Sequence, residues 1–372
     1  MSHFLVGRIS AAFRVSRPFR EALAPHRYPW GHGEREEKVW GRRALESPRG
    51  DLLPSSRIPC FPGNRMDVSV IIVSWNVWEW LAPCLDSVRE ALGALNGEII
   101  VVDNASTDGT PERVREAFPE VRLLVNSVNR GFPAANNQGM AIARGRYFFL
   151  LNPDTRVLDR AIESLVAFAE DHPEAGVVGP QLLNPDGTVQ SSRRRFPTFW
   201  TALFESTWWQ PYAPRRILQR YYVLDRPDEE IQEVDWVTGA AMLVRREAVE
   251  QVGPMDEGFF MYAEEMDWCR RMRAAGWRVF YYPRAKVIHY GGRSSEQVPA
   301  VQHLAFQRSK IRYFRKHHGP IAAAALRAFL IGQYLWQMGV EGAKAASGHK
   351  RAMRWRRIQI YAQVVRGLIK DQ

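Results

Sequence analysis

The sequence predicts an α/β fold: a doubly wound, mostly parallel sheet flanked by helices, followed by a helical C-terminal extension. Short apolar runs rich in Val and Ile recur along residues 68–283, and segments of helical character separate most of them. Such runs are typical of strands that are buried on both faces of a parallel sheet. Regular alternation of strands and helices is the pattern that builds this kind of sheet.

The elements can be assigned in chain order. The expected strands span residues 68–75, 98–103, 121–125, 147–152, 176–179, 240–246 and 278–283. The expected helices span about residues 79–95, 133–144, 159–171 and 263–275, and a further helix opens at Thr110. Thr110 suits an N-cap, Pro111 suits the first helical position, and Gly276 is a typical residue after a helix C-terminus.

Charge is distributed unevenly along the chain. Residues 1–65 hold 12 Lys and Arg against 6 Asp and Glu, and residues 300–372 hold 14 against 2. Residues 66–299 hold 25 against 32, so an acidic body lies between two basic ends. This asymmetry indicates an anionic partner surface, either a membrane leaflet or a nucleic acid. A nucleic acid is disfavoured, because the basic residues lie outside the folded body and no nucleic-acid-binding motif is present.

Three regions follow from these patterns. Residues 1–65 are rich in Arg, Pro and Gly without periodicity, so we expect a poorly ordered basic segment. Met66 directly precedes the first strand, and a start site there would leave this segment upstream of the native start. Residues 66–298 form the expected globular domain. Residues 299–372 form the expected basic, helical, membrane-associating tail.

The tail contains a stretch with the length of a membrane span, residues 321–340. This stretch includes Arg327, Gln333 and Gln337, which are costly at the centre of a bilayer. An amphipathic helix that lies in the membrane interface therefore fits better than a spanning helix. Further along, Trp355 lies among arginines, a combination that suits a layer of anionic headgroups.

The chain also indicates its compartment. No signal peptide is expected, because arginines interrupt the apolar residues near the N-terminus. Cys60, Cys84 and Cys269 have no paired spacing, so we interpret them as incidental thiols in a reducing compartment. We therefore expect a cytoplasmic protein, peripheral at the inner face of a membrane.

Polar residues follow three of the expected strands at the point where each strand ends. Ser74, Trp75 and Asn76 lie at the end of the first strand, residues 103–110 (DNASTDGT) at the end of the second, and residues 152–155 (NPDT) at the end of the fourth. Ligands of open parallel sheets bind at the carboxyl ends of the strands. The chain has neither a G-x-G-x-x-G nor a P-loop sequence. A nucleotide at this edge therefore needs another source of positive charge, and a divalent metal on a carboxylate is the obvious one.

A series of motifs makes the interpretation specific. In chain order they are VSVIIVSWN (68–76), VVDNASTDGT (101–110), NRGFPAANNQGM (129–140), FFLLNPDT (148–155), QSSRRRFPT (190–198), VTGAAMLVRR (237–246), FFMYAEEMDWCRR (259–271) and KVIHYGG (286–292). Together they resemble the family 2 glycosyltransferases of GT-A fold, particularly the rhamnosyltransferase-like branch. The resemblance covers about residues 67–315, which makes residues 66–298 the expected catalytic domain.

The resemblance implies roles on the nucleotide side of the site. Asp103 would accept a hydrogen bond from the imide N–H of a uracil or thymine ring, with Ser74 and Trp75 beside the base. Asn129, Arg130 and Asn137 would line the same side of the cleft. Arg130 is equally well interpreted as a surface arginine.

The resemblance also implies a metal site and a general base. Asp154 matches the last acid of the family's D-x-D metal motif, and Asn152 stands where the first acid is expected. Mg²⁺ or Mn²⁺ would be held by Asp154, His289 and the donor's diphosphate. Glu265 would be the base, with Glu264 as its neighbour, and the choice between the two stays open. The helix dipole would keep such carboxylates ionised.

These roles together imply an inverting glycosyltransferase. It would move a sugar, with rhamnose as the first expectation, from a dTDP- or UDP-linked donor to a lipid-linked or polysaccharide acceptor. One alternative is a catalytically inactive relative that kept the fold as a binding protein. A nucleotidyltransferase uses a similar sheet, but the glycine-rich loop expected after its first strand is missing.

Overall fold

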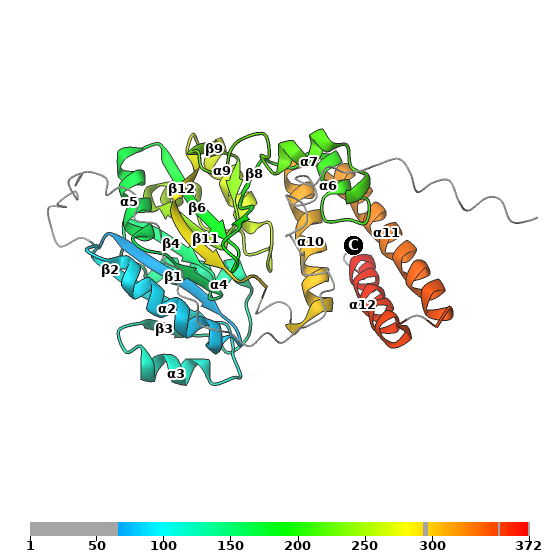
Figure 1. Ribbon diagram of the computed structural model, residues 1–372, viewed down its shortest axis with the longest axis horizontal. Helices are drawn as coiled ribbons and strands as arrows, with labels where there is room; N and C mark the ends of the chain where they lie inside the picture. The colour runs from blue at the N-terminus through cyan, green and yellow to red at the C-terminus, as the bar shows by residue number, and fades with distance from the viewer. Residues whose placement is uncertain (1–65, 293–296, 349, 371–372) are drawn as a thin grey trace, which may run out of the picture. The chain divides into compact units, whose positions relative to one another are not determined.

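The computed structural model describes residues 66–292, 297–348 and 350–370 of the chain (Figure 1). The basic segment 1–65, with Cys60, lies outside the described residues. Cys84 and Cys269 are buried free thiols, and burial raises the pKa of each to about 12. At that pKa neither thiol is a nucleophile at neutral pH, in agreement with their interpretation as incidental.

A mixed, mostly parallel sheet forms the centre of the fold, in the strand order β3-β2-β1-β4-β11-β6-β12-β5. Six of its strands share one direction. They are β1 (Val68–Ser74), β2 (Gly97–Asp103), β3 (Arg122–Val125), β4 (Tyr147–Leu151), β6 (Ala175–Leu183) and β12 (Arg278–His289). The expected mostly parallel sheet is therefore confirmed.

The remaining strands are antiparallel or short, and most of them were not predicted. The predicted strand 240–246 is β11 (Ala241–Arg245), which runs antiparallel between β4 and β6. The unpredicted strands are β5 (Thr155–Val157), β7 (Val189–Gln190), β8 (Arg193–Arg194), β9 (Gln232–Val234) and β10 (Trp236–Val237). Strands of two or three residues are too short to show an alternating pattern, which is why the sequence did not reveal them.

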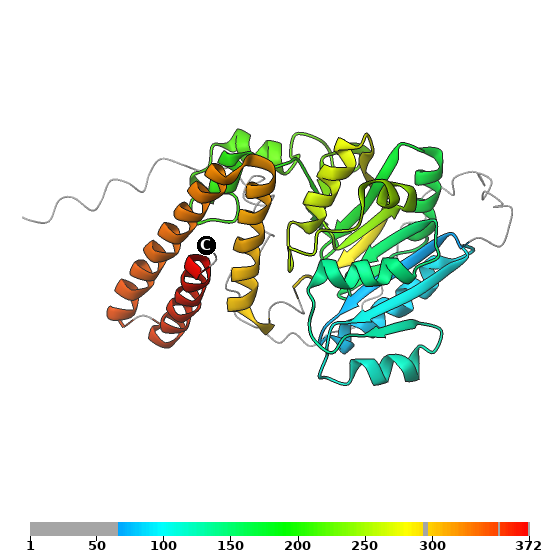
Figure 2. The same ribbon diagram turned by 180° about the vertical axis from the view of Figure 1, so that it is seen from behind.

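Helices cover both faces of the sheet. In the first part of the chain they are α2 (Trp78–Leu92), α3 (Thr110–Ala117), α4 (Phe132–Ile142) and α5 (Ala161–Asp171). Further along are α8 (Arg246–Val252) and α9 (Glu264–Ala274). The chain also forms α6 (Phe199–Phe204), the 3₁₀ helix η1 (Gln210–Tyr212) and α7 (Arg215–Tyr221), and Figure 1 shows α6 and α7 away from the sheet. Figure 1 shows α2 in front of the sheet, and the reverse view in Figure 2 shows α4 in front of it.

Alternate residues of β1 explain why two layers of helices form. Val70 and Ile72 lie in one buried cluster with Leu81 and Leu85 of α2. Ile71 faces the other side, where a Cβ added to Gly139 of α4 would lie 2.5 Å from its side chain. Because β1 is buried along its whole length, both of its faces need an apolar partner, and glycine lets α4 approach closely.

The C-terminal region is helical, as expected. It consists of α10 (Pro299–His318), α11 (Pro320–Ala346) and α12 (Arg351–Lys370), which pack on one another (Figure 1). Within the described residues, no helix has the length and apolar character needed to cross a membrane.

Helix α10 is joined to the globular domain by buried charges. Asp267 of α9 has no exposed surface, and its carboxylate accepts hydrogen bonds from His317 Nε2 at 2.7 Å and Lys316 Nζ at 2.9 Å. Burial alone would raise the pKa of Asp267, but these bonds and that from Arg271 hold it at about 2. Arg271, one turn further along α9, donates to the same carboxylate at 3.0 Å, so Asp267 binds its own helix as well as α10.

Candidate functional site

The carboxyl ends of three neighbouring strands meet at one edge of the sheet. Strand β1 lies between β2 and β4, and its last residue, Ser74, is paired in register with Asp103. Asn152 and Asp154 follow β4 directly at the same end. The three polar segments picked out in the sequence are therefore brought together.

Two buried polar atoms at this edge have no hydrogen-bond partner among the described residues. They are Ser74 Oγ and Asp103 Oδ2, which belong to the paired ends of β1 and β2. The other carboxylate oxygen of Asp103 accepts a hydrogen bond from the Ser106 amide at 2.9 Å. Burial raises the pKa of Asp103, and the bond from Ser106 offsets this in part. Buried polar groups are rarely left without a hydrogen bond, so these two atoms indicate a place where a ligand forms hydrogen bonds with the protein.

The buried side chain of Asn104 organises the loop that carries two of the predicted residues. Its amide nitrogen donates to Asn129 Oδ1 at 2.9 Å, and its oxygen accepts from the Arg130 backbone N–H at 3.0 Å. Asn129 Oδ1 also accepts from Gly131. Asn129 is thus engaged within its own loop, while the Arg130 side chain is exposed.

Asn137 lies elsewhere on α4. Its amide nitrogen donates to the Met255 carbonyl at 2.9 Å and to Glu257 at 3.0 Å, and its oxygen accepts from the Met255 N–H at 3.0 Å. All of these partners belong to the segment that leads to α9. Asn137 therefore fixes that segment.

Asp154 and His289 face one another. His289 ends β12 and pairs in register with Thr155 of β5, which places its ring beside the loop that follows β4. His289 Nε2 lies 3.5 Å from Asp154 Oδ1 and 3.4 Å from Asn152 Nδ2. Asp154 is 5% exposed. Asp154 and His289, the two predicted metal-binding residues, thus lie close together.

Gln190 of β7 sets the orientation of the His289 ring. Its amide nitrogen donates to the His289 carbonyl and to Asn184, so its oxygen is left to accept from His289 Nδ1 at 2.7 Å. Nδ1 then carries the proton and Nε2 presents its lone pair toward Asp154. Gln190 is the first residue of the motif at residues 190–198, but nothing in the sequence pattern indicated its contact with His289.

This donor set fits a divalent cation. A carboxylate oxygen and an imidazole nitrogen that lie 3.5 Å apart can act as two ligands of one cation, and the bond from Gln190 to the other ring nitrogen is the kind of contact that orients a metal-binding histidine. Within the described residues, no group of three or more His, Cys, Asp or Glu side chains is assembled to hold a metal. The protein would therefore supply two ligands. Mg²⁺ and Mn²⁺ commonly complete such shells with water and substrate phosphates.

Glu264 and Glu265 open α9 after two residues in the left-handed region. Tyr262 has φ of 73° and Ala263 has φ of 65°, a conformation that is strained for residues other than glycine. Ser309 of α10 helps to hold this turn by donating to the Met261 carbonyl at 2.8 Å. Glu264 is 4% exposed. Both glutamates have an Oε2 that is buried without a partner among the described residues.

Burial opposes the effect that the helix dipole is expected to have on these carboxylates. Burial raises the pKa of Glu264 well above its usual range, and the neighbouring Glu265 charge raises it further. Burial also raises the pKa of Glu265, but the Gly239 N–H and the positive charge of Arg194 oppose this. Desolvation therefore outweighs the dipole, and Glu264 holds its proton more strongly than Glu265 does.

Residues 238–240 connect the glutamates to the sheet edge. Gly239 N donates to Glu265 Oε1 at 3.4 Å, and the adjacent Ala240 carbonyl accepts from Asn152 N at 2.9 Å. Glu265, the candidate base, is thus linked to the loop that carries Asp154 through the consecutive residues Gly239 and Ala240. Thr238 Oγ1 and Ser192 Oγ are buried nearby without partners in the described part of the chain, and Thr238 N donates to the Ser192 carbonyl. Ser192 lies in the motif at residues 190–198 and Thr238 in the motif at residues 237–246, but nothing in the sequence pattern indicated a role for either side chain.

Known proteins resemble this chain over most of the sheet. The family model described as Glycosyl transferase family 2 matches residues 69–253. N-acetylglucosaminyl-diphospho-decaprenol L-rhamnosyltransferase of Mycobacterium tuberculosis is 33% identical over 245 residues, which are 63% of this chain and 80% of that protein. Rhamnosyltransferase WbbL of Escherichia coli K12 is 46% identical over 57 residues, which are 15% of this chain and 22% of that protein.

Two solved structures show a more distant likeness. The mannosyltransferase PcManGT from Pyrobaculum calidifontis, in complex with GDP-Man and Mn²⁺, has a TM-score of 0.48 at 18% identity and covers 82% of this chain and 87% of its own. GalNAc-T7 with UDP, GalNAc and Mn²⁺ has a TM-score of 0.46 at 18% identity, over 65% and 48% of the two chains. A likeness at this level carries no conclusion about the donor or the metal of this chain.

Proposed function

Because the chain belongs to glycosyl transferase family 2 and is a glycosyltransferase, we propose that it moves a sugar with inversion from a dTDP- or UDP-linked donor to a lipid-linked or polysaccharide acceptor. L-Rhamnose is the first candidate for the sugar. The mycobacterial relative, of which the chain covers 80%, is an L-rhamnosyltransferase that acts on a decaprenol-linked acceptor.

The observation that carries this proposal is the link through residues 239–240. It joins Glu265, a half-buried glutamate with a raised pKa, to the strand ends that hold Asp154, His289 and the unpaired atoms of Ser74 and Asp103. A proton acceptor, a cation site and a nucleotide site are the three parts that a metal-assisted, inverting sugar transfer uses.

The chemistry assigns one task to each group. Asp103 Oδ2 would accept the imide N–H of the base, which holds the donor at the edge of the sheet. Asp154 and His289 would hold a divalent cation, which when bound neutralises charge on the leaving diphosphate. Glu265 would take the proton of the acceptor hydroxyl. The hydroxyl oxygen would then form its bond to the anomeric carbon as the bond from that carbon to the diphosphate oxygen breaks, which inverts the centre.

A donor screen tests the proposal. The full chain is incubated with UDP-, dTDP- and GDP-linked sugars and a short-chain lipid-diphosphate N-acetylglucosamine, with Mg²⁺, Mn²⁺ or chelator, and release of nucleoside diphosphate is measured. We expect metal-dependent release from a uracil or thymine donor. Asp103→Ala should raise the donor KM about tenfold, by loss of a hydrogen bond, while Asp186→Ala, in an exposed turn, should not. Equal use of GDP-sugars would contradict the role of Asp103, and no release from any donor would contradict the proposal.

We also propose that the protein is peripheral at the inner membrane face, through its tail and an adjoining aromatic surface. Exposed aromatic side chains of the segment from α6 to η1 lie beside α11, where the rings of Trp208 and Trp336 are 6.4 Å apart. The exposed members are Trp200, Trp208, Trp209, Tyr212 and Trp336. Tryptophan and tyrosine favour the headgroup level of a bilayer.

Vesicle flotation tests this location. Truncation after Gly319 removes α11 and α12 with their basic residues, each of which contributes about 1 kcal/mol of attraction near an anionic surface. We expect the full chain to float with phosphatidylglycerol vesicles and the truncated chain to stay in the dense fraction. Trp336→Ser with Trp355→Ser, which changes two exposed side chains, should weaken flotation without removing a helix. Continued flotation of the truncated chain would show that the tail is not the anchor.

A further inference from the structure

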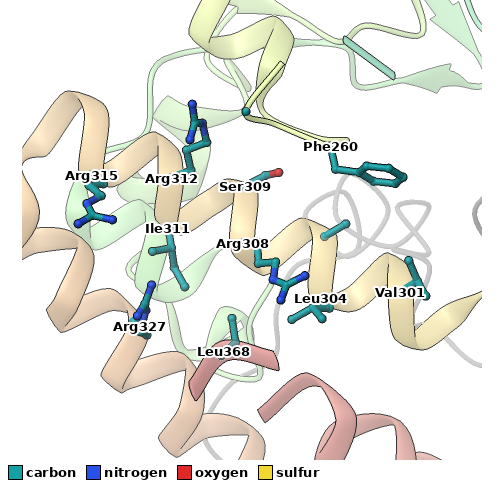
Figure 3. A pocket seen from close by; sticks show the side chains of 12 residues that line it. Phe260, Val301, Leu304, Arg308, Ser309, Ile311, Arg312, Arg315, Arg327 and Leu368 are labelled. Carbon is teal, nitrogen blue, oxygen red and sulfur yellow. The ribbon is translucent and has the colours of Figure 1, made fainter. Parts of the chain in front are cut away.

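A cavity of about 650 Å³ lies between α10, α11, the end of α12 and the loop at Gly258 and Phe260 (Figure 3). Its lining divides into two kinds of side chain. Four arginines contribute charge: Arg308, Arg312 and Arg315 of α10, and Arg327 of α11. The other large side chains are apolar: Phe260, Val301, Leu304, Ile311 and Leu368.

The residues that line this cavity include no acidic side chain to balance the charge of the arginines, within the part of the chain that the structure describes. Arg312 is paired with Asp256 at 2.9 Å, but within the described residues Arg315 and Arg327 make no ion pair or hydrogen bond. Figure 3 shows Arg315, Arg327 and Arg308 arranged around Ile311, whereas Arg312 turns toward the loop. Like charges gathered at a partly enclosed site repel, and an anion relieves that repulsion.

The chemistry of arginine narrows the anion to a phosphate or diphosphate. The guanidinium group presents several N–H donors in a plane and binds phosphate oxygens in pairs. A small, fully hydrated anion would leave the apolar side chains of the cavity unused. A hydrocarbon chain would find an apolar surface directly beside the arginines. That surface is formed by Val301, which is 54% exposed, Leu304 and Leu368. The lining thus suits a molecule with a phosphate head and an apolar chain.

The cavity shares its loop with the general base. Residues 258–263 run from the cavity wall to the first turn of α9. A Cβ added at Gly258 would lie 1.9 Å from the Arg312 guanidinium, so that arginine lies against the backbone of this loop. The Phe260 carbonyl accepts from Phe132 N at 2.8 Å, and Gln302 of α10 donates to the Tyr262 hydroxyl at 3.0 Å. A ligand held by α10 and α11 is therefore positioned relative to Glu265 through one short segment.

We propose that this cavity binds the diphosphate and the first part of the hydrocarbon chain of a lipid-linked acceptor, with Arg315 and Arg327 as its phosphate-binding residues. The assignment rests on the proposed function, because it identifies the ligand as the acceptor. An anionic phospholipid headgroup has the same phosphate and chain chemistry, so the experiment must separate the two sources.

Direct binding tests the site without any turnover. The full chain is titrated calorimetrically with farnesyl diphosphate and, separately, with inorganic pyrophosphate. We expect farnesyl diphosphate to bind the more tightly. Arg315→Gln with Arg327→Gln should weaken that binding about tenfold or more, by loss of charge-assisted hydrogen bonds. Val301→Ser, at an exposed position, should weaken binding of farnesyl diphosphate and leave that of pyrophosphate unchanged.

A matched control removes the same charge elsewhere. Arg115→Gln with Arg284→Gln loses two exposed arginines outside the cavity and should bind farnesyl diphosphate like the wild type. Equal affinity for pyrophosphate and farnesyl diphosphate would overturn the proposal in favour of a plain anion site. Loss of flotation with phosphatidylglycerol vesicles in the Arg315/Arg327 variant, with farnesyl diphosphate binding intact, would overturn it in favour of a phospholipid headgroup.

Kinetics then separate this proposal from the proposed function. With a short-chain lipid-diphosphate acceptor, the Arg315/Arg327 variant should show a raised KM for the acceptor and an unchanged KM for the donor. Binding of farnesyl diphosphate without transfer from any donor would leave the site standing and refute the proposed function. Normal transfer with an unchanged acceptor KM would refute the site and leave the function standing.

Discussion

Replacing Glu265 by Gln is expected to lower kcat by about 10²–10⁴-fold, the range that positioned general bases contribute. The side chain keeps its size and can still accept from Gly239 N, but it can no longer take a proton. Initial rates of sugar transfer at saturating donor and acceptor measure the effect, and the melting temperature shows whether the fold is intact. A kcat within a few-fold of wild type would show that Glu265 is not the base.

The pH dependence of kcat provides a second readout of the same residue. Burial raises the pKa of Glu265 above its ordinary value of 4.5, so the ionised, base-competent form is lost as the pH falls through that raised pKa. We expect kcat to decline on the acid side at a pH above 4.5 in the wild type. The residual activity of Glu265→Gln should lack this decline.

Glu264→Gln is the matched comparison, because it changes the neighbouring carboxyl in the same way. Burial and the neighbouring Glu265 charge raise the pKa of Glu264 well above its usual range, and an amide resembles the neutral form that this shift favours. We expect Glu264→Gln to retain most of the wild-type kcat. The reverse result, with Glu264→Gln inactive and Glu265→Gln active, would exchange the two roles.

The sequence revealed the parts of the site that depend on local pattern. Ser74, Asp103 and Asp154 follow apolar runs, and the rule that ligands bind at the carboxyl ends of parallel strands places such residues together without knowledge of packing. The ends of these three strands were placed within one residue, whereas the strands predicted at 176–179 and 278–283 continue to Leu183 and His289. The positions of His289 and Glu265 came from resemblance, since one histidine and two glutamates have no pattern of their own.

Long-range contacts account for what the sequence missed. Gln190 acts on His289 from 99 residues away through strands of two residues, and Gly239 meets Glu265 at a connection with no periodicity. The sequence did not reveal the burial that opposes ionisation of Glu264 and Glu265, because a helix start is visible in a sequence whereas burial is a property of the packed fold. Helix α10 was assigned to the tail, although Lys316 and His317 neutralise the buried Asp267 of α9.

The second large effect is expected for Asp154→Ala, which should lower kcat by about 100-fold or more. That loss corresponds to several kcal/mol of stabilisation of the leaving diphosphate. His289 would be left as the single protein ligand in the described site, so Mn²⁺ binding in the presence of nucleoside diphosphate should weaken together with turnover. Electron paramagnetic resonance of Mn²⁺ measures the first quantity, and initial rates over a metal titration measure the second.

Gln190→Leu distinguishes a lost ligand from a misoriented one. The substitution leaves Asp154 and His289 in place but removes the acceptor that fixes the proton on His289 Nδ1. Changes of this kind typically cost about 10–100-fold in metal affinity. Excess Mn²⁺ should therefore restore the kcat of Gln190→Leu toward wild type, whereas it should not restore Asp154→Ala. If Asp154→Ala recovers fully with excess metal, or turns over normally without any, then its carboxylate does not hold the cation on which departure of the diphosphate depends.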